Sequence, residues 1–118
     1  MKIDSVRTHA ISLEAVTEEP HHDYSSFRVR GKIFVTVPPA EEVVHVFVGE
    51  EDREPALALY PKFIEKLLWG GKVVGLRITL ASANPGAVKS LVSKAYEARV
   101  RKDAGPKVSR AGKRGAKP

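Results

Sequence analysis

The sequence predicts an α+β fold, a single compact domain in which an antiparallel sheet with two hairpins packs against helices. Two runs of alternating apolar and polar residues are each divided by a glycine-containing turn, at Gly31 and at Gly70-Gly71. Apolar residues then recur at helical spacing from Val88 to Tyr96. The expected order is therefore helix, hairpin, strand, helix, hairpin, helix.

The chain of 118 residues has the length of one domain, and 42% of its residues are hydrophobic. We place the α+β domain at residues 1–98 and the end of the last helix with a basic tail at 99–118. The tail is rich in Lys, Arg, Gly, Ala and Pro and has few large apolar residues. Because such a segment buries too little surface to offset its ordering entropy, we expect disorder from about residue 101 onward.

The net charge of +6 is unevenly distributed along the chain. Residues 1–98 carry twelve Lys and Arg against thirteen Asp and Glu, a balance of −1. Residues 99–118 carry eight Lys and Arg against one acid, Asp103. The basicity therefore belongs to the tail, and any affinity of the folded part for a polyanion has to come from local clusters of cations.

Several classes of protein are excluded by composition. The chain has no cysteine, so disulfides, thiolate zinc sites and a cysteine nucleophile are ruled out. No apolar run approaches the roughly 20 residues that span a bilayer, and the first residues lack the apolar segment of a signal peptide. We expect a cytoplasmic protein without a membrane partner, and a monomer by default.

The first helix is expected to begin after Asp4, whose carboxylate can cap the first amides. One face of it carries the apolar residues at helical spacing, which are Ile3, Val6, Ala10 and Leu13. The segment EEPHHD at 18–23 interrupts any pattern, and Pro20 is expected to stop regular pairing there.

The first hairpin is predicted from the sequence SSFRVRGKIFVTV at 25–37. Residues 25–30 alternate, with Phe27 and Val29 on one face, and Gly31-Lys32 is expected to form the turn. Residues 33–37 are β-branched except for one phenylalanine, which is typical of a buried strand.

The middle of the chain is expected to hold a third strand at 43–48 and a short helix from about Asp52 to Tyr60. Acidic residues gather before this helix, as they do at helix N-termini, and Pro55 is compatible only with its first turn.

Residues 62–69 fit a helical face and a strand equally on spacing alone. The turn that follows and the alternation over 73–80 favour a strand, and hence a second hairpin. The last helix is the clearest element, with Asn84 as its N-cap and Pro85 at its first position.

The hairpin at 25–37, the preceding HHD, and the later WGGKVVGLRITL with its capped helix resemble the MmcQ/YjbR-like family of small bacterial proteins. The resemblance covers about residues 4–98, and the basic tail lies outside it. It implies a compact fold similar to CyaY-like or double-wing domains, and a DNA-binding function. It supplies no catalytic residue.

Binding of nucleic acid would use cations of the two hairpins and of the tail. Cations on one concave surface would give sequence-independent affinity by releasing counterions from phosphates. Alternating arginines also occur on the solvated face of ordinary hairpins, and both interpretations stay open. The cations expected to contact phosphates are Arg28, Arg30, Lys32, Lys66, Lys72, Arg77, Arg101, Lys102, Lys107, Arg110, Lys113 and Arg114.

The aromatic residues argue against reading of bases. Binders of single strands stack bases on exposed rings. The larger aromatic side chains here fall on faces that are expected to be core: Phe27, Phe34, Phe47, Trp69 and Tyr96. With no recognisable base-reading motif, contact with the backbone is the expected mode.

Metal-binding and catalytic patterns are weak. His21, His22 and Asp23 lie near strand residue His45, but adjacent histidines in a strand point to opposite faces. We expect no metal and instead a hydrogen bond from one histidine of the pair to the hairpin. Ser25 and Ser26 near these histidines lack a nucleophile elbow, and Gly70-Gly71-Lys72 lacks the spacing of a P-loop. We therefore expect neither an enzyme nor a cofactor.

Two functions remain from different classes. The first is weak, non-specific binding of DNA through the hairpins, acting as wings, and through the basic tail. The alternative is a non-enzymatic module that binds a protein or a small ligand, with an incidental basic tail. Binding to phosphates would weaken steeply with salt, whereas an apolar partner would be retained.

Overall fold

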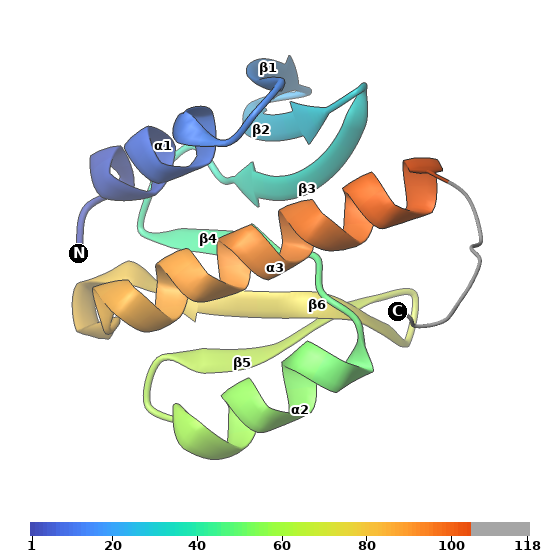
Figure 1. The fold of residues 1–118 in the computed structure, drawn as a ribbon. Coiled ribbons are helices and arrows are strands. Elements are labelled where there is room, and N and C mark those ends of the chain that lie inside the picture. The colour runs from blue at the N-terminus through green and yellow to red at the C-terminus, as the bar shows by residue number, and fades with distance from the viewer. Residues whose placement is uncertain (105–118) are drawn as a thin grey trace.

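The computed structural model describes residues 1–104. Along these residues three α-helices, one 3-10 turn and six strands follow one another (Figure 1). The helices are α1 (Ile3–Ser12), α2 (Glu50–Leu59) and α3 (Pro85–Ala104), and the 3-10 turn is η1 (Leu80–Ser82). The strands are β1 (Val16–His21), β2 (Tyr24–Val29), β3 (Lys32–Val37), β4 (Val43–Val46), β5 (Ile64–Trp69) and β6 (Lys72–Thr79).

The six strands form one antiparallel sheet in the order β1-β2-β3-β4-β6-β5. Helix α3 crosses one face of this sheet, with α1 beside it and α2 near the β5 edge (Figure 1). No helix of residues 1–104 covers the other face, which we call the helix-free face; it carries Ser26, Thr36, His45 and Arg77. The predicted α+β fold and both predicted hairpins, β2–β3 and β5–β6, are confirmed, and β1–β2 adds a further hairpin whose turn at 22–23 lies at the opposite end of the sheet.

The core lies between the helices and the sheet. Phe27 and Phe34 of the first hairpin are fully buried there, as are Leu76 and Ile78 of β6. Helix α3 contributes its predicted apolar stripe, including Val88 and other side chains that are almost fully buried. Burial of this stripe against the sheet, at about 25 cal/mol per Å² of apolar surface, holds α3 in place.

Helix α1 begins at Ile3, one residue before the predicted cap. Lys2 occupies the N-cap position and makes no side-chain capping bond. Asp4 therefore lies inside the first turn, where the helix dipole favours its carboxylate, and it pairs with Arg7 at 3.0 Å. Ile3, Val6 and Ala10 are buried as predicted.

Strand β1 was not predicted, because Pro20 was expected to prevent regular pairing. The structure pairs Pro20 with Ser25 on an edge strand. Proline is tolerated at a sheet edge, since one side of that strand has no partner that requires its missing N–H. Arg7 of α1 holds β1 by donating from Nε to Glu18 Oε1 at 3.0 Å.

The two hairpin turns share one geometry. Arg30 and Gly31 have φ of 53° and 79°, and Gly70 and Gly71 have 57° and 80°. Positive φ at both central residues is the signature of a type I′ turn, which matches the twist of the strands. The first turn is thus Arg30-Gly31 rather than the predicted Gly31-Lys32, and Lys32 belongs to β3.

The remaining elements agree with expectation in type and differ at their ends. Residues Ile64–Trp69 are a strand, as favoured. Helix α2 begins right after Gly49, whose carbonyl accepts from the amide of Arg53 at 2.9 Å, so Pro55 lies in the second turn.

Helix α3 begins where predicted and extends further than predicted. Asn84 caps it, because its Oδ1 accepts from the amide of Ala87 at 3.1 Å. The helix continues to Ala104, so residues 101–104 are helical where we expected disorder. The tail beyond, at 105–118, lies outside the described residues. No helix of the described part is long and apolar enough to cross a membrane.

Candidate nucleic-acid interface at the hairpin tips

Both hairpin turns lie at the same end of the sheet. The register places Val29 against Lys32 at the tip of the first hairpin, and Trp69 against Lys72 at the tip of the second. Strand β4 joins the two hairpins in the middle, through Val35–Val46 and Val46–Leu76 pairs. Because every pair is antiparallel, the two turns emerge on the same side of β4, as Figure 1 shows.

The end of α3 lies at this same end of the sheet. Arg99 donates from Nε to the carbonyl oxygen of Ile33 at 2.8 Å and so ties the helix to the start of β3. Arg101 follows on the exposed surface, close to the end of α3. We call the surface formed by residues 30–32, 70–72 and 99–101 the wing end.

Three of the six predicted hairpin cations lie at the wing end. Arg30 belongs to the first turn, and Lys32 and Lys72 are the first residues of the strands that follow the two turns. All three side chains are exposed. Together with Arg99 and Arg101 they bring five cations, from three elements far apart in the chain, to one end of the molecule.

Arg28 forms hydrogen bonds within the sheet. Its guanidinium donates from Nε to Ser26 Oγ at 2.9 Å and from a terminal nitrogen to the carbonyl oxygen of Pro20 at 3.2 Å. These bonds connect β2 to the edge strand β1 on the helix-free face.

Lys66 and Arg77 lie on opposite faces of the sheet. Lys66 is opposite Leu76, which faces the helices, whereas Arg77 is opposite Glu65 on the helix-free face. Arg77 contacts Glu65 at 3.4 Å and is about half exposed. The six hairpin cations therefore do not share one concave surface, since Lys66 is turned away from the others.

Of the predicted tail cations, Arg101 and Lys102 fall within α3. The four others lie outside the described residues: Lys107, Arg110, Lys113 and Arg114.

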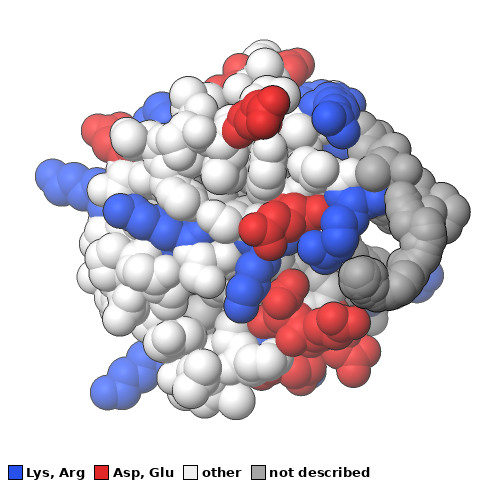
Figure 2. Space-filling view, viewed as in Figure 1, with Lys and Arg blue, Asp and Glu red and all other residues white. Residues whose placement is uncertain are grey.

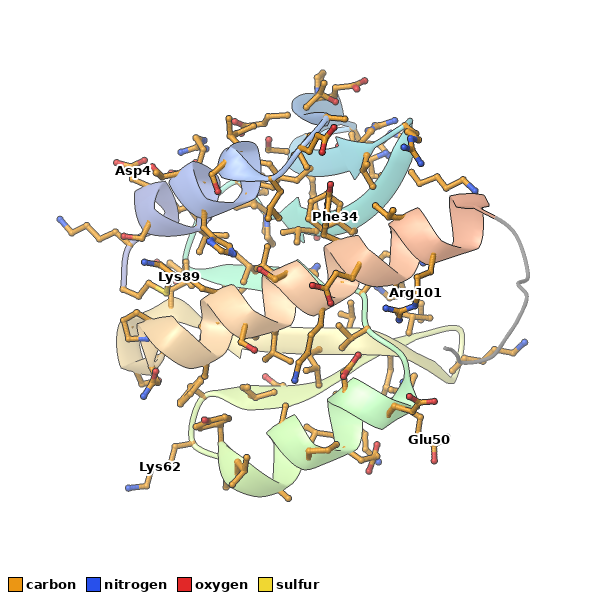
Figure 3. All side chains as sticks on the ribbon, viewed as in Figure 1. Asp4, Phe34, Glu50, Lys62, Lys89 and Arg101 are labelled. Atoms are coloured by element: carbon orange, nitrogen blue, oxygen red, sulfur yellow. The ribbon has the colours of Figure 1, made fainter. Side chains whose placement is uncertain are left out.

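Acidic residues border the wing end on the helix-covered face. Figure 2 shows both signs of charge mixed over this face, with acids gathered over the start of α2, where Figure 3 labels Glu50. Arg101 lines a surface hollow of about 600 Å³ together with Glu50, Glu51 and Glu54. A polyanion would thus be repelled from the α2 side of Arg101 and favoured on the side of the hairpins.

The helix-free face contains a buried histidine. His45 is only 6% exposed, and its Nδ1 lies 3.3 Å from Thr36 Oγ1. Burial and the nearby Arg77 guanidinium lower the pKa of His45 below its usual value of 6.5. The ring is therefore neutral at pH 7 and is part of the sheet's packing.

The candidate metal ligands do not converge. His21 and His22 have ring centroids 4.9 Å apart, but the described residues contain no group of three or more His, Asp or Glu that could hold a metal ion. The hydrogen bond that we expected from one of these histidines to the hairpin stays a prediction.

The expectation that all the large aromatic residues lie in the core is wrong for Trp69. It is 51% exposed, beside Leu68 at 57%, whereas Phe27 and Phe34 are fully buried. Burial does not alternate along β5, since Ile64 and Leu67 are both buried, and Trp69 is the last residue of this edge strand. No further strand of residues 1–104 covers its ring.

Two contacts were not foreseen from the sequence. One is the hydrogen bond between His9 Nε2 and Ser93 Oγ at 2.8 Å, which links α1 to α3. The other is the position of Arg99 at the wing end. Both join residues more than sixty positions apart, and no local pattern signals such a pair.

Comparison with known proteins agrees with this fold. The family model described as YjbR matches residues 11–98. The crystal structure of Deinococcus radiodurans protein DR2400, with a domain of the DUF419 family, superposes with a TM-score of 0.72 at 16% identity. The superposition covers 90% of this chain and 83% of that one. A search of curated proteins finds no match. The chain belongs to the YjbR family, as its two hairpins and capped last helix predicted.

Proposed function

We propose that this protein binds nucleic acid without sequence preference, by docking phosphates on the cations of the wing end. The observation that carries the proposal is the convergence of both hairpin turns and the end of α3 at one end of the sheet. Residues 105–118, which follow Ala104 in the sequence, add further cations. We propose no catalytic step and no cofactor. We propose a cytoplasmic location.

The backbone at Arg30 adopts a conformation that favours glycine. A residue with a side chain pays roughly 1–2 kcal/mol for the left-handed conformation, which glycine adopts freely. The second hairpin has Gly70 at the equivalent position, with nearly the same φ. The turn of the first hairpin therefore carries a cation where the turn of the second hairpin has a glycine.

Fluorescence anisotropy with a labelled mixed-sequence duplex tests the proposal in the full chain. The wing-end variant combines Arg30→Gln, Lys32→Gln and Lys72→Gln. A matched control combines Lys2→Gln, Lys62→Gln and Lys89→Gln, three exposed lysines away from the wing end (Figure 3 labels Lys62 and Lys89). Both variants lose three positive charges. A difference between their affinities for the duplex therefore shows that the position of the cations matters.

We expect the dependence of the affinity on salt concentration to come mainly from the cations of the wing end. Affinity of the natural chain should fall linearly with salt in a log–log plot between about 50 and 200 mM. The wing-end variant should reduce the slope by about 0.9 for each phosphate contact that is lost, and the control should change it little. Equal losses in the two variants would refute a defined interface.

The tail is tested separately in the full chain. Replacing Lys107, Arg110, Lys113 and Arg114 by glutamine should weaken binding at all sequences while leaving a residual slope from the wing end. If all binding disappears in this variant, the folded domain is not the binding element.

A second candidate function is favoured by the exposed Leu68 and Trp69. They are consecutive residues of the edge strand β5 and lie on its opposite sides, where each adds apolar surface that another protein could contact. Such a partner would be retained at high salt, which separates this function from phosphate docking.

A further inference from the structure

The sheet opens between the two hairpins near their tips. Strand β4 ends at Val46, and the next contact with β3 is a single bond from the amide of Phe47 to the carbonyl oxygen of Phe34, at 3.1 Å. Beyond it, the start of β3 and the start of β6 have no strand between them. A cleft of about 290 Å³ lies at this opening.

The cleft has one wall from each side of the opening. Its lining residues are His21, Ile33 and Thr36 on the side of the first hairpin, Phe47, Trp69 and Val74 on the other, and Arg99 from α3. Its volume is close to the lower end of the range for small-ligand pockets. The occupant must therefore be small or a single group of a larger molecule.

The second wall is aromatic. The rings of Phe47 and Trp69 contact each other with centroids 5.2 Å apart and an angle of 58° between their planes. Phe47 is 9% exposed and fixes the position of its neighbour, while half of Trp69 stays open to solvent. A tryptophan that packs against one neighbouring ring and stays half exposed is a suitable surface for stacking a flat group.

The charge around the cleft favours an anion. Arg99 lines it, and no acidic residue of the described chain is among its lining residues. Lys72 is the register partner of Trp69, and Lys32 precedes Ile33 in β3. A flat group with a negative charge close to it is the chemistry of a nucleotide.

We propose that this cleft accepts one base of a single-stranded nucleic acid, stacked on Trp69, with the flanking phosphates near Arg99 and Lys72. This inference rests on the proposed function and adds a preference for single strands over duplex. In a duplex the bases are already stacked on each other, and only an unpaired base can enter the cleft. Single-strand binders combine cations and stacking rings in this way.

Two other occupants fit less well. The chain's own tail is basic, and Arg99 would repel it. An apolar peptide would leave the charge of Arg99 without a counter-ion in the cleft.

Trp69 is the only tryptophan of the chain, so its fluorescence reports on the cleft directly. The full-length protein is titrated with an unlabelled oligothymidine of about 12 nucleotides. A matched oligonucleotide of the same length, in which abasic sites replace the bases, supplies the same phosphates without stacking partners. The duplex form is the third ligand, and anisotropy of labelled versions gives the affinities.

We expect oligothymidine to quench Trp69 and to bind about tenfold more tightly than the abasic strand. Trp69→Ala should remove this advantage and leave the affinity for the abasic strand and the duplex unchanged. The control Leu68→Ala changes a side chain of similar exposure on the opposite side of β5 and should leave the advantage intact.

Two outcomes would overturn the inference, and they differ from failure of the proposed function. If the abasic strand binds as tightly as oligothymidine, phosphate docking stands and the base site is refuted. If oligothymidine binds tightly without quenching Trp69, bases are read elsewhere. If none of the three ligands binds in a salt-dependent way, the proposed function itself fails.

Discussion

The two predicted hairpins of this protein, β2–β3 and β5–β6, are built alike at their tips. Each turns through two residues with positive φ, at 30–31 and at 70–71, and each has an irregularity in its register near the turn. Each also carries a cation on the first residue after the turn, Lys32 and Lys72. The two hairpins therefore have the same type of turn and the same local irregularity.

The hairpins differ in what surrounds them. Strands β2 and β3 are inside the sheet, between β1 and β4, and bury Phe27 and Phe34 under the helices. Strand β5 is an edge, and its last two residues, Leu68 and Trp69, are exposed. The comparison shows that the first hairpin anchors the fold, whereas the second offers aromatic surface to the outside.

The largest expected effect comes from truncating one aromatic residue in each hairpin. Phe34→Ala removes a fully buried ring that contacts Tyr96, and should lower the free energy of unfolding by about 3–5 kcal/mol. Trp69→Ala removes a half-exposed ring and should cost less than about 1 kcal/mol. Urea denaturation measures both, and similar losses would break the distinction between the hairpins.

The next effect concerns Gly75, where β6 passes the end of β4. A Cβ at this position would collide with the carbonyl oxygen of Val46 and lie 3.1 Å from Phe47 Cα. Gly75→Ala should therefore destabilise the protein by about 1–3 kcal/mol, because backbone atoms have to move. Gly49→Ala is the control, since its Cβ meets no atom within 4 Å and the change from Gly to Ala at this N-cap should cost only about 0.5 kcal/mol. Equal melting temperatures of the two variants would contradict this close approach.

A smaller effect is expected when the second turn is made to resemble the first. Gly70→Arg places a side chain at φ of 57° and should cost about 1 kcal/mol, as the left-handed conformation requires. It should also tighten binding to duplex DNA, because it adds a cation at the wing end.

The control for that variant is Leu68→Arg, which adds the same charge at an exposed strand position of β5 without positive φ. It should leave stability nearly unchanged. Thermal unfolding and anisotropy check both variants, and a Gly70→Arg protein without any loss of stability would show that the turn tolerates side chains freely.

The smallest effect is a pH dependence from His45, in the strand that joins the hairpins. The pKa of His45 in the fold is lowered by burial and by Arg77, so the unfolded chain binds a proton more readily. Stability should therefore fall as pH drops below about 6.5 and the unfolded state becomes protonated.

His45→Gln should flatten this dependence, measured as the urea midpoint between about pH 5 and 7. His22→Gln, at an exposed turn, should leave it in place. An unchanged slope in His45→Gln would assign the dependence to other groups.

The elements that the sequence predicted were those with local causes. Asn84 caps α3 through its own side chain, and the glycines of the turns mark both hairpins because they favour positive φ. Strand β1 was missed because proline is excluded from central strands but tolerated in edge strands. Whether Pro20 lies at an edge depends on the order of strands in the whole sheet.

The candidate site was predictable only in part, for the same reason. The sequence placed Lys32 and Lys72 at the two predicted turns, but it could not show that the two turns lie at the same end of the sheet. The exposure of Trp69 depends on β5 having no neighbour, and the place of Arg99 depends on a bond to Ile33. Both facts arise from tertiary packing, which spacing along the chain does not contain.

The central claim is that both hairpin tips belong to one nucleic-acid interface. The most direct measurement is an NMR titration of the full chain with oligothymidine and with duplex, following the glycine amides. The account predicts that Gly31, Gly70 and Gly71 shift together at the same ligand concentrations, while Gly86, at the opposite end of α3, stays unchanged. Shifts at one hairpin tip only, or shifts of equal size at Gly86, would contradict it.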